Sequence, residues 1–98
     1  MTVISKDLEA KAIQWGTWMG ENMASRQWRQ HFPYFSTAEV TLNAQVSASN
    51  EALEYKVPAE AYSQWEQIFI GQYTDAYTAK VAERETHEIA RQAQIVRK

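Results

Sequence analysis

The 98-residue sequence contains no cysteine, which excludes disulfide bonds, thiolate metal sites and cysteine nucleophiles. No apolar run is long enough to span a membrane, and residues 1–7 lack the apolar core of a secretory signal. Glycine occurs only three times, and no glycine-rich phosphate loop is present. These absences favour a cytoplasmic protein without a membrane partner.

Histidine is scarce as well. His87 and Glu88 resemble the start of a zincin helix, but position 91 is arginine where that motif needs its second histidine. His31 is the only other histidine, and we cannot assemble a nucleophile, a base and an acid from the sequence. We therefore expect no enzyme activity, no metal site and no cofactor.

Basic charge is scarce in the middle of the chain, although the net charge is only −2. Residues 36–75 carry one lysine against six acidic residues, a sum of −5, whereas residues 76–98 carry five basic against three acidic residues, a sum of +2. The negative net charge argues against a strongly basic nucleic-acid binder. Uneven charge of this kind steers association without identifying the partner.

The two prolines help to delimit two helices. Ser5 is a suitable N-cap for a first helix, which should end before Pro33. Helical spacing places six apolar residues of this segment on one stripe: Ile4, Leu8, Ala12, Trp15, Met19 and Met23. Gly16 and Gly20 lie on the opposite flank at G-x-x-x-G spacing, which predicts a notch for a core aromatic or for the second helix.

Residues 38–57 alternate between apolar and polar side chains on both sides of a polar loop at residues 49–51. This alternation predicts a β-hairpin with one buried face. The segment from Ser36 to Glu39 also fits a capping box, which would begin a helix instead. We favour the hairpin because the alternation spans both halves.

Pro58 at a first turn, followed by Glu60, predicts the start of a second helix. This helix has a core stripe, and a second stripe lies about 120–140° away on the helical wheel. Beyond residue 80 the core stripe becomes polar, so the helix either breaks there or residues 81–98 project as a helical tail.

These elements predict one α+β domain over residues 1–98. Two main helices would pack on a small antiparallel β-hairpin in the order helix, strand, strand, helix, with an extended C-terminal helix. The expected core consists of Trp15, Met19, Val40, Leu42, Val46, Trp65, Ile68 and Phe69.

Apolar residues left over from that core predict a small non-enzymatic protein-interaction module, an inhibitor or adaptor that binds a protein partner and forms a homodimer. The expected contacts are Trp18, Ile70, Tyr77, Val81 and Ile89. The alternative is a nucleic-acid-binding transcriptional regulator, since cations and aromatics interleave near the end of the first helix. Its contacts would be Arg26, Trp28, Arg29 and His31, with Arg84 and Arg91 as further cations.

The segment from Leu8 to Met19 resembles the W-G-x-W helix near the start of some phage antitermination proteins. The resemblance is confined to this stretch, and we recognise no counterpart of that family's helix-turn-helix, so we assign no family from it. Small, acidic chains without cysteine are also common among phage-encoded inhibitors of host machinery. A phage-encoded inhibitor is therefore one form that the interaction module could take.

Overall fold

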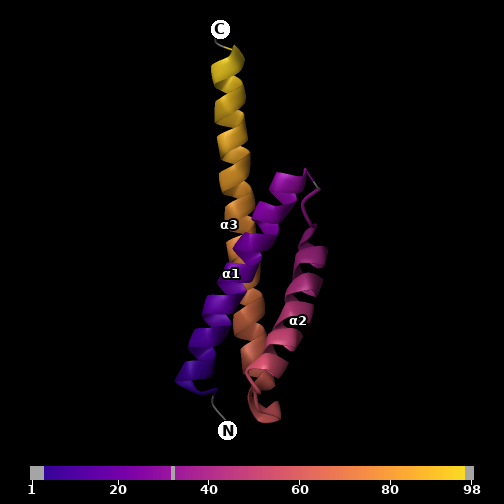
Figure 1. The fold of residues 1–98 in the computed structure, drawn as a ribbon, viewed down its shortest axis with the longest axis vertical. Helices are drawn as coiled ribbons and strands as arrows, with labels where there is room; N and C mark the ends of the chain where they lie inside the picture. Colours follow the sequence, from indigo (N-terminus) through magenta and orange to yellow (C-terminus); the bar gives the residue numbers. More distant parts are fainter. Residues whose placement is uncertain (1–3, 32, 97–98) are drawn as a thin grey trace.

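Three α-helices and one short 3₁₀ turn make up the computed structural model of the chain (Figure 1). The structure describes residues 4–31 and 33–96, and for residues 89–96 it describes the helical backbone only. The elements are α1 (Lys6–Gln30), α2 (Thr37–Glu54), η1 (Ala59–Ala61) and α3 (Tyr62–Val96). No strand occurs in these residues, so the expected α+β class is wrong and the fold is an all-α bundle.

The predicted hairpin is the helix α2, and its capping box decides the outcome. The Ser36 Oγ accepts the Glu39 N–H at 3.2 Å, while the Glu39 carboxylate accepts the Ser36 N–H at 3.0 Å. Both bonds satisfy N–H groups that a helix start leaves free. The alternation led to the wrong prediction because residues four positions apart lie on one face both in a strand and in a helix. Val40 and Ala44 are therefore compatible with either structure.

The buried face of α2 consists of residues spaced by four, namely Val40, Ala44, Ala48 and Ala52. Leu42 and Val46 were expected in the core, but both are exposed. Residues two positions apart share a face in a strand, but on a helix they point in directions about 160° apart. The change of secondary structure therefore turns these two side chains outward.

The limits predicted for the first helix are confirmed. The Ser5 Oγ accepts the Leu8 N–H at 3.2 Å, which caps α1 at its first turn. α1 ends at Gln30, and His31 follows in the left-handed conformation with φ of 58°. Its backbone N–H bonds to the carbonyls of the last turn, a usual way to end a helix.

The predicted start of the second helix is confirmed as well: η1 follows Pro58 and leads directly into α3. α3 does not break near residue 80 but continues to Val96, and its C-terminal part extends past the ends of α1 and α2 (Figure 1). The tail expected at residues 81–98 is thus part of one long helix as far as the described residues reach.

A row of aromatic side chains on α3 fills the core at a spacing of four residues: Trp65, Phe69, Tyr73 and Tyr77. Such a row drifts by about 40° around the helix at each step. α1 crosses α3 obliquely in Figure 1, so the drifting row stays under its neighbours. The drift carries Tyr77 about 120° from Trp65, which is why the sequence pattern assigned it to a second stripe.

Among the expected core residues, Val40, Trp65 and Phe69 are buried. Trp15, Met19 and Ile68 are partly buried and pack against the core from its edge. On α1 the centre of the contact belongs instead to smaller residues spaced by four: Ala12, Gly16, Gly20 and Ala24.

The predicted notch at Gly16 and Gly20 is confirmed, and the helix α3 occupies it. A Cβ atom at Gly16 would lie 2.8 Å from the Phe69 carbonyl oxygen, and one at Gly20 would collide with the backbone of Tyr73. The axes of α1 and α3 approach this closely only because Gly16 and Gly20 have no Cβ atom.

We expect Gly20→Ala to lower the free energy of unfolding by about 1–3 kcal/mol, because the added methyl group overpacks a rigid backbone contact. The matched control is Gly71→Ala on α3, where nothing lies within 4 Å of an added Cβ. This control should raise stability by up to about 1 kcal/mol through helix propensity. Denaturant unfolding followed by tryptophan fluorescence measures both changes, and equal effects of the two variants would contradict the notch.

Candidate functional site

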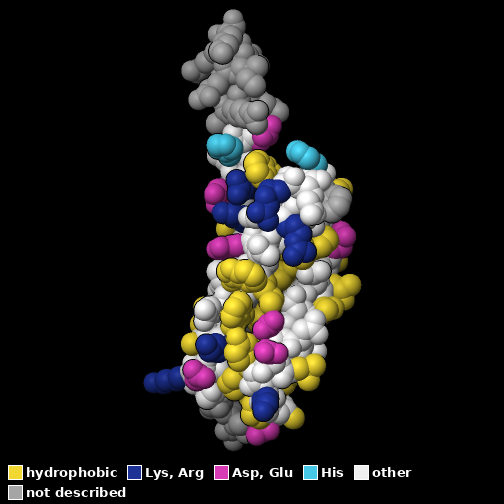
Figure 2. Space-filling model, in the orientation of Figure 1, with side chains coloured by type: hydrophobic (Ala, Val, Ile, Leu, Met, Phe, Trp, Pro, Cys, Tyr) yellow, Lys and Arg dark blue, Asp and Glu magenta, His cyan; other side chains and the backbone are white. Residues whose placement is uncertain are grey.

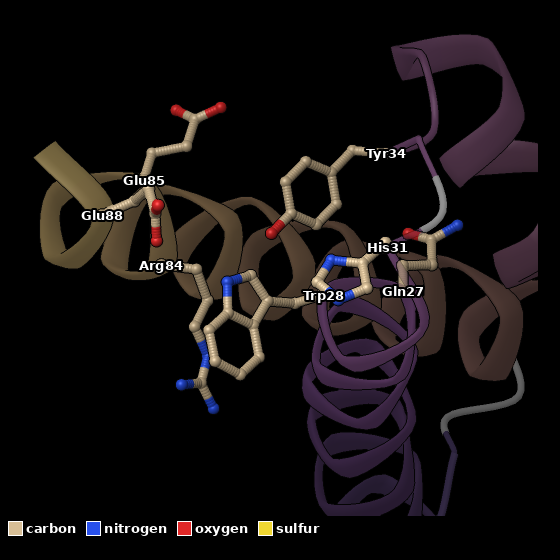
Figure 3. A pocket seen from close by; sticks show the side chains of 7 residues that line it. All are labelled: Gln27, Trp28, His31, Tyr34, Arg84, Glu85 and Glu88. Atoms are coloured by element: carbon tan, nitrogen blue, oxygen red, sulfur yellow. The ribbon is translucent and has the colours of Figure 1, made fainter. Parts of the chain in front are cut away.

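A cleft of about 480 Å³ opens where the C-terminal end of α1, the following loop and α3 meet (Figure 3). Its lining combines an indole, an imidazole, a phenol, an amide, a guanidinium and two carboxylates: Gln27, Trp28, His31, Tyr34, Arg84, Glu85 and Glu88. Two of the residues expected to contact nucleic acid, Trp28 and His31, are thereby brought next to α3.

The cation of this cleft is already engaged. The Arg84 guanidinium carbon lies 4.5 Å from the centroid of the Trp28 ring, a cation–π contact that covers one face of the indole. Two carboxylates share the cleft with this single arginine, so the lining carries a charge of −1 when His31 is neutral. A phosphate group is therefore poorly matched to the cleft, and Trp28 offers no free double-sided platform for a base.

The negative charge also acts on Tyr34. Burial, followed by the charge of Glu85, raises the pKa of the Tyr34 phenol above its ordinary value, while Arg84 acts in the opposite direction. The phenol therefore stays protonated at neutral pH, where it is neither a base nor a nucleophile.

Tyr77, expected as a partner contact, lies in the core with only 3% of its surface exposed. Its hydroxyl donates to the Gln27 side-chain oxygen and accepts the Phe35 N–H at 2.7 Å. These bonds connect α3, α1 and the loop between α1 and α2. Tyr77 is therefore not available to a partner in this structure. The prediction was wrong because the helical-wheel stripe that contains Tyr77 is buried where α3 crosses α1 obliquely.

The other expected contacts on α3 are less accessible than predicted. Ile70 and Val81 are half-buried and pack against the core. Val81 also lines a small apolar pocket of about 180 Å³ beside Phe35 and Val40. The side chain of Ile89 lies outside the described residues, as does that of Arg91.

Trp18 is the predicted contact that does lie at the surface, with 53% of its area exposed. Its ring meets Trp15 edge to face, with centroids 5.6 Å apart. Cations flank it on two sides: Arg26 shares a shallow groove with Trp18 between α1 and α2, and Lys80 shares a second hollow with it beside α3. Arg26 and Arg29 are exposed, and Figure 2 shows Lys and Arg side chains gathered over this part of the bundle.

The large apolar side chains with the highest exposed fractions lie on α2, where the sequence pattern had placed a buried strand. Leu42, Val46 and Leu53 are 62%, 55% and 79% exposed. Their spacings of four and seven residues place them on one stripe of the helix, opposite the alanines that face the core. Figure 2 shows hydrophobic side chains along the edge of the bundle that α2 forms. We call this stripe the α2 outer face.

The charge of α2 is acidic, but helical spacing places only Glu39 near the α2 outer face. Glu39, Glu51 and Glu54 are the charged residues of α2, which contains no lysine or arginine. Burial, followed by the charge of Glu54, raises the pKa of Glu51. Sequence reasoning missed this surface, although the capping box and the alanines at a spacing of four were signals that could have revealed it.

Within the described residues no three His, Asp or Glu side chains come together in a way that could hold a metal ion. None of the described helices combines the length and the hydrophobicity needed to cross a lipid bilayer. We found no match to the chain among protein-family models, curated proteins or solved structures. Its own surfaces are therefore the basis for a functional proposal.

The groove beside Trp18 ends on Tyr73, whose hydroxyl donates to the Asn43 side-chain oxygen at 2.6 Å. Burial, followed by the charge of Tyr77, raises the pKa of Tyr73 to about 12, while Arg26 acts in the opposite direction.

The folded state therefore holds the Tyr73 proton more tightly than the unfolded chain, so this contribution to stability is complete below pH 10 and is lost as the pH rises towards about 12. We expect the free energy of unfolding to fall more steeply over this window in the wild type than in Tyr73→Phe, which cannot ionise. Denaturant unfolding at a series of alkaline pH values measures both slopes, and equal slopes would contradict the assignment.

Proposed function

We propose that the chain is a non-enzymatic protein-binding module, of the inhibitor or adaptor type, and that the α2 outer face is its contact surface. The observation that carries the proposal is the stripe of Leu42, Val46 and Leu53. Single exposed apolar residues are ordinary on a protein surface. Three large ones aligned on one helix, with the polar Ser49 and Asn50 between Val46 and Leu53, form an apolar stripe of the kind that a groove or a second helix covers.

The energetics of α2 support this proposal. Its inward face consists of Val40 and three alanines, so Leu42, Val46 and Leu53 contribute little to the core of the single chain. Fully burying a leucine or valine side chain is worth about 1.5–3 kcal/mol. A partner that covers the stripe would recover that free energy at each position, less the entropy lost on association.

Photo-crosslinking in cells of the natural source tests the proposal. A photoreactive residue at Gln45, exposed beside the stripe on α2, should give a protein adduct, whereas the same residue at exposed Gln67 on α3 should not. Leu42→Gln with Val46→Gln should reduce the Gln45 adduct at least about tenfold, because each lost apolar contact costs that much in affinity.

Equal adducts from the two positions would contradict the α2 outer face as the contact surface. An adduct that survives the paired glutamine substitutions would do the same. Leu42 and Val46 are exposed, so their substitution should leave the fold intact. Helix content measured by circular dichroism checks that each variant is folded.

One observation favours a second candidate function, the binding of single-stranded nucleic acid. An exposed indole that stacks on bases, with cations on both sides that neutralise phosphates, is the combination that such binding uses. Trp18 with Arg26 and Lys80 provides it, and Arg29 extends the positive charge along α1. The glutamate residues nearby reduce this charge: Glu21 shares the hollow, and Glu83 forms an ion pair with Lys80 at 3.6 Å.

Under this second candidate, a fluorescently labelled oligonucleotide should bind at low salt and weaken at least about tenfold at moderate salt, because binding releases counterions. Arg26→Gln with Arg29→Gln should weaken binding further, whereas Lys6→Gln at the other end of α1 should not. Absence of binding to both single-stranded and duplex oligonucleotides at low salt would remove this candidate.

A further inference from the structure

We propose that the α2 outer face binds the same face of a second copy, so that two antiparallel α2 helices form the centre of a two-fold symmetric dimer. This inference rests on the proposed function, because it uses the same contact surface and identifies its occupant. Three properties of α2 lead to it: the spacing of the stripe, the way in which the stripe matches its own reverse, and the charges at and beside it.

The spacing of the α2 outer face is that of a seam between two helices. Leu42, Val46, Ser49 and Leu53 follow one another at alternate intervals of four and three residues, and Glu39 continues the series towards the start of the helix. This alternation is the heptad pattern by which two helices interlock their side chains. All five residues are exposed in the single chain. The seam is therefore open to a second helix.

The stripe matches its own reverse. When two copies of α2 run antiparallel with Leu42 opposite Leu53 of the second copy, Val46 lies opposite Ser49 of the second copy, because both pairs are centred between residues 47 and 48. The two-fold axis repeats both pairs, so a pair of leucines closes each end of the seam and a branched side chain faces a small one in its middle. Large and small side chains at facing positions allow the layers to interlock.

The charges at the ends of the stripe favour the antiparallel pair. The same register places Glu39 beside Lys56 of the second copy, which directly follows the C-cap residue of α2. Both residues are exposed, and neither belongs to the single salt bridge of the described residues, which joins Lys80 to Glu83. A parallel pair would instead bring the two copies of Glu39 together. Opposite charges therefore meet in one arrangement and like charges in the other.

The flanks of the stripe carry no charge that opposes pairing with a second copy. Gln45 and Asn50 are exposed there, and an amide side chain both donates and accepts hydrogen bonds, so identical flanks are compatible with each other. Helical spacing places Glu51 about 160° and Glu54 about 100° around the helix from the middle of the stripe, which keeps both carboxylates out of the seam.

The size of the contact sets the expected affinity. α2 has 18 residues and is therefore about 27 Å long. It forms one side of the bundle in Figure 1, so its outer face can meet a second copy along its length. A contact between one pair of helices lies at the small end of protein interfaces, so we expect a dissociation constant in the micromolar range. Both outer faces are covered in the pair, which leaves no open end for further association.

Sedimentation velocity of the full chain over the micromolar range tests the inference. Leu42→Gln with Val46→Gln should raise the dimer dissociation constant at least about tenfold, because each dimer loses four apolar side chains from the seam. The matched control is Ile13→Gln on α1, which replaces another exposed apolar residue and should leave the dimer unchanged. Circular dichroism checks that the helix content of each variant is normal.

Disulfide formation tests the antiparallel register, since the chain has no cysteine of its own. A chain with Leu42→Cys, mixed with a chain with Leu53→Cys and oxidised, should give a disulfide-linked dimer that contains one of each. Leu42→Cys alone should give none, because its two copies lie about 17 Å apart along the helix axis in this register.

A chain that is monomeric across the concentration range, or a dimer that the paired glutamine substitutions weaken no more than Ile13→Gln does, would overturn the inference. A disulfide that forms as readily with Leu42→Cys alone as in the mixture, or that fails to form in the mixture, would also overturn it. The proposed function is tested separately: an adduct from Gln45 to a different protein, together with a monomeric chain, would support protein binding and reject the second copy as the occupant.

Discussion

The bundle depends on the close approach of α1 and α3 at Gly16 and Gly20. At these positions the two backbones come nearer than any larger residue would allow, as the contacts of an added Cβ atom show. Alanines one turn before and one turn after extend the contact along α1. With α1 placed this closely, the aromatic row of α3 is covered by α1, by the α1–α2 loop and by the alanine face of α2.

The polar atoms of the buried Trp65, Tyr73 and Tyr77 side chains then need hydrogen-bond partners inside the core. The Trp65 indole N–H donates to the Ala48 carbonyl at 3.0 Å, and Tyr73 and Tyr77 donate to side-chain oxygens of α2 and α1. Buried polar atoms are costly without such bonds, so these contacts select one arrangement of the helices. Small residues on α1 and α2 therefore face large ones on α3, and Leu42, Val46 and Leu53 of α2 remain outside.

This distribution shapes the functional proposals. The interleaved cations and aromatics near the end of α1 suggested a ligand platform, but Arg84 from α3 covers Trp28 and acidic residues share the cleft. Trp18 alone keeps an exposed indole there. Among the described residues the α2 outer face has no comparable contact, and its exposed leucine and valine side chains are the feature that a partner would cover.

Local sequence signals were sufficient for the limits of α1 and for the start of α3. Ser5 and Pro58 act within one turn of the chain, so no distant contact is needed to interpret them. The glycine notch was predictable for a similar reason. Each glycine in a helix lowers its stability, and close packing of a second helix is a feature that can offset this cost. The capping box at Ser36 carried equally local information, and the hairpin prediction was wrong because the alternation was given more weight.

Only the tertiary structure decided which side chains are buried. The α2 segment has an apolar pattern compatible with two periods, and it is packing of its alanines against α3 that exposes Leu42 and Val46. Likewise, the sequence by itself determined that Tyr77 lies on a helix about 120° from Trp65, whereas the oblique crossing of α1 and α3 determined that both are core residues. Periodicity depends on one helix axis, but burial depends on the angle between two.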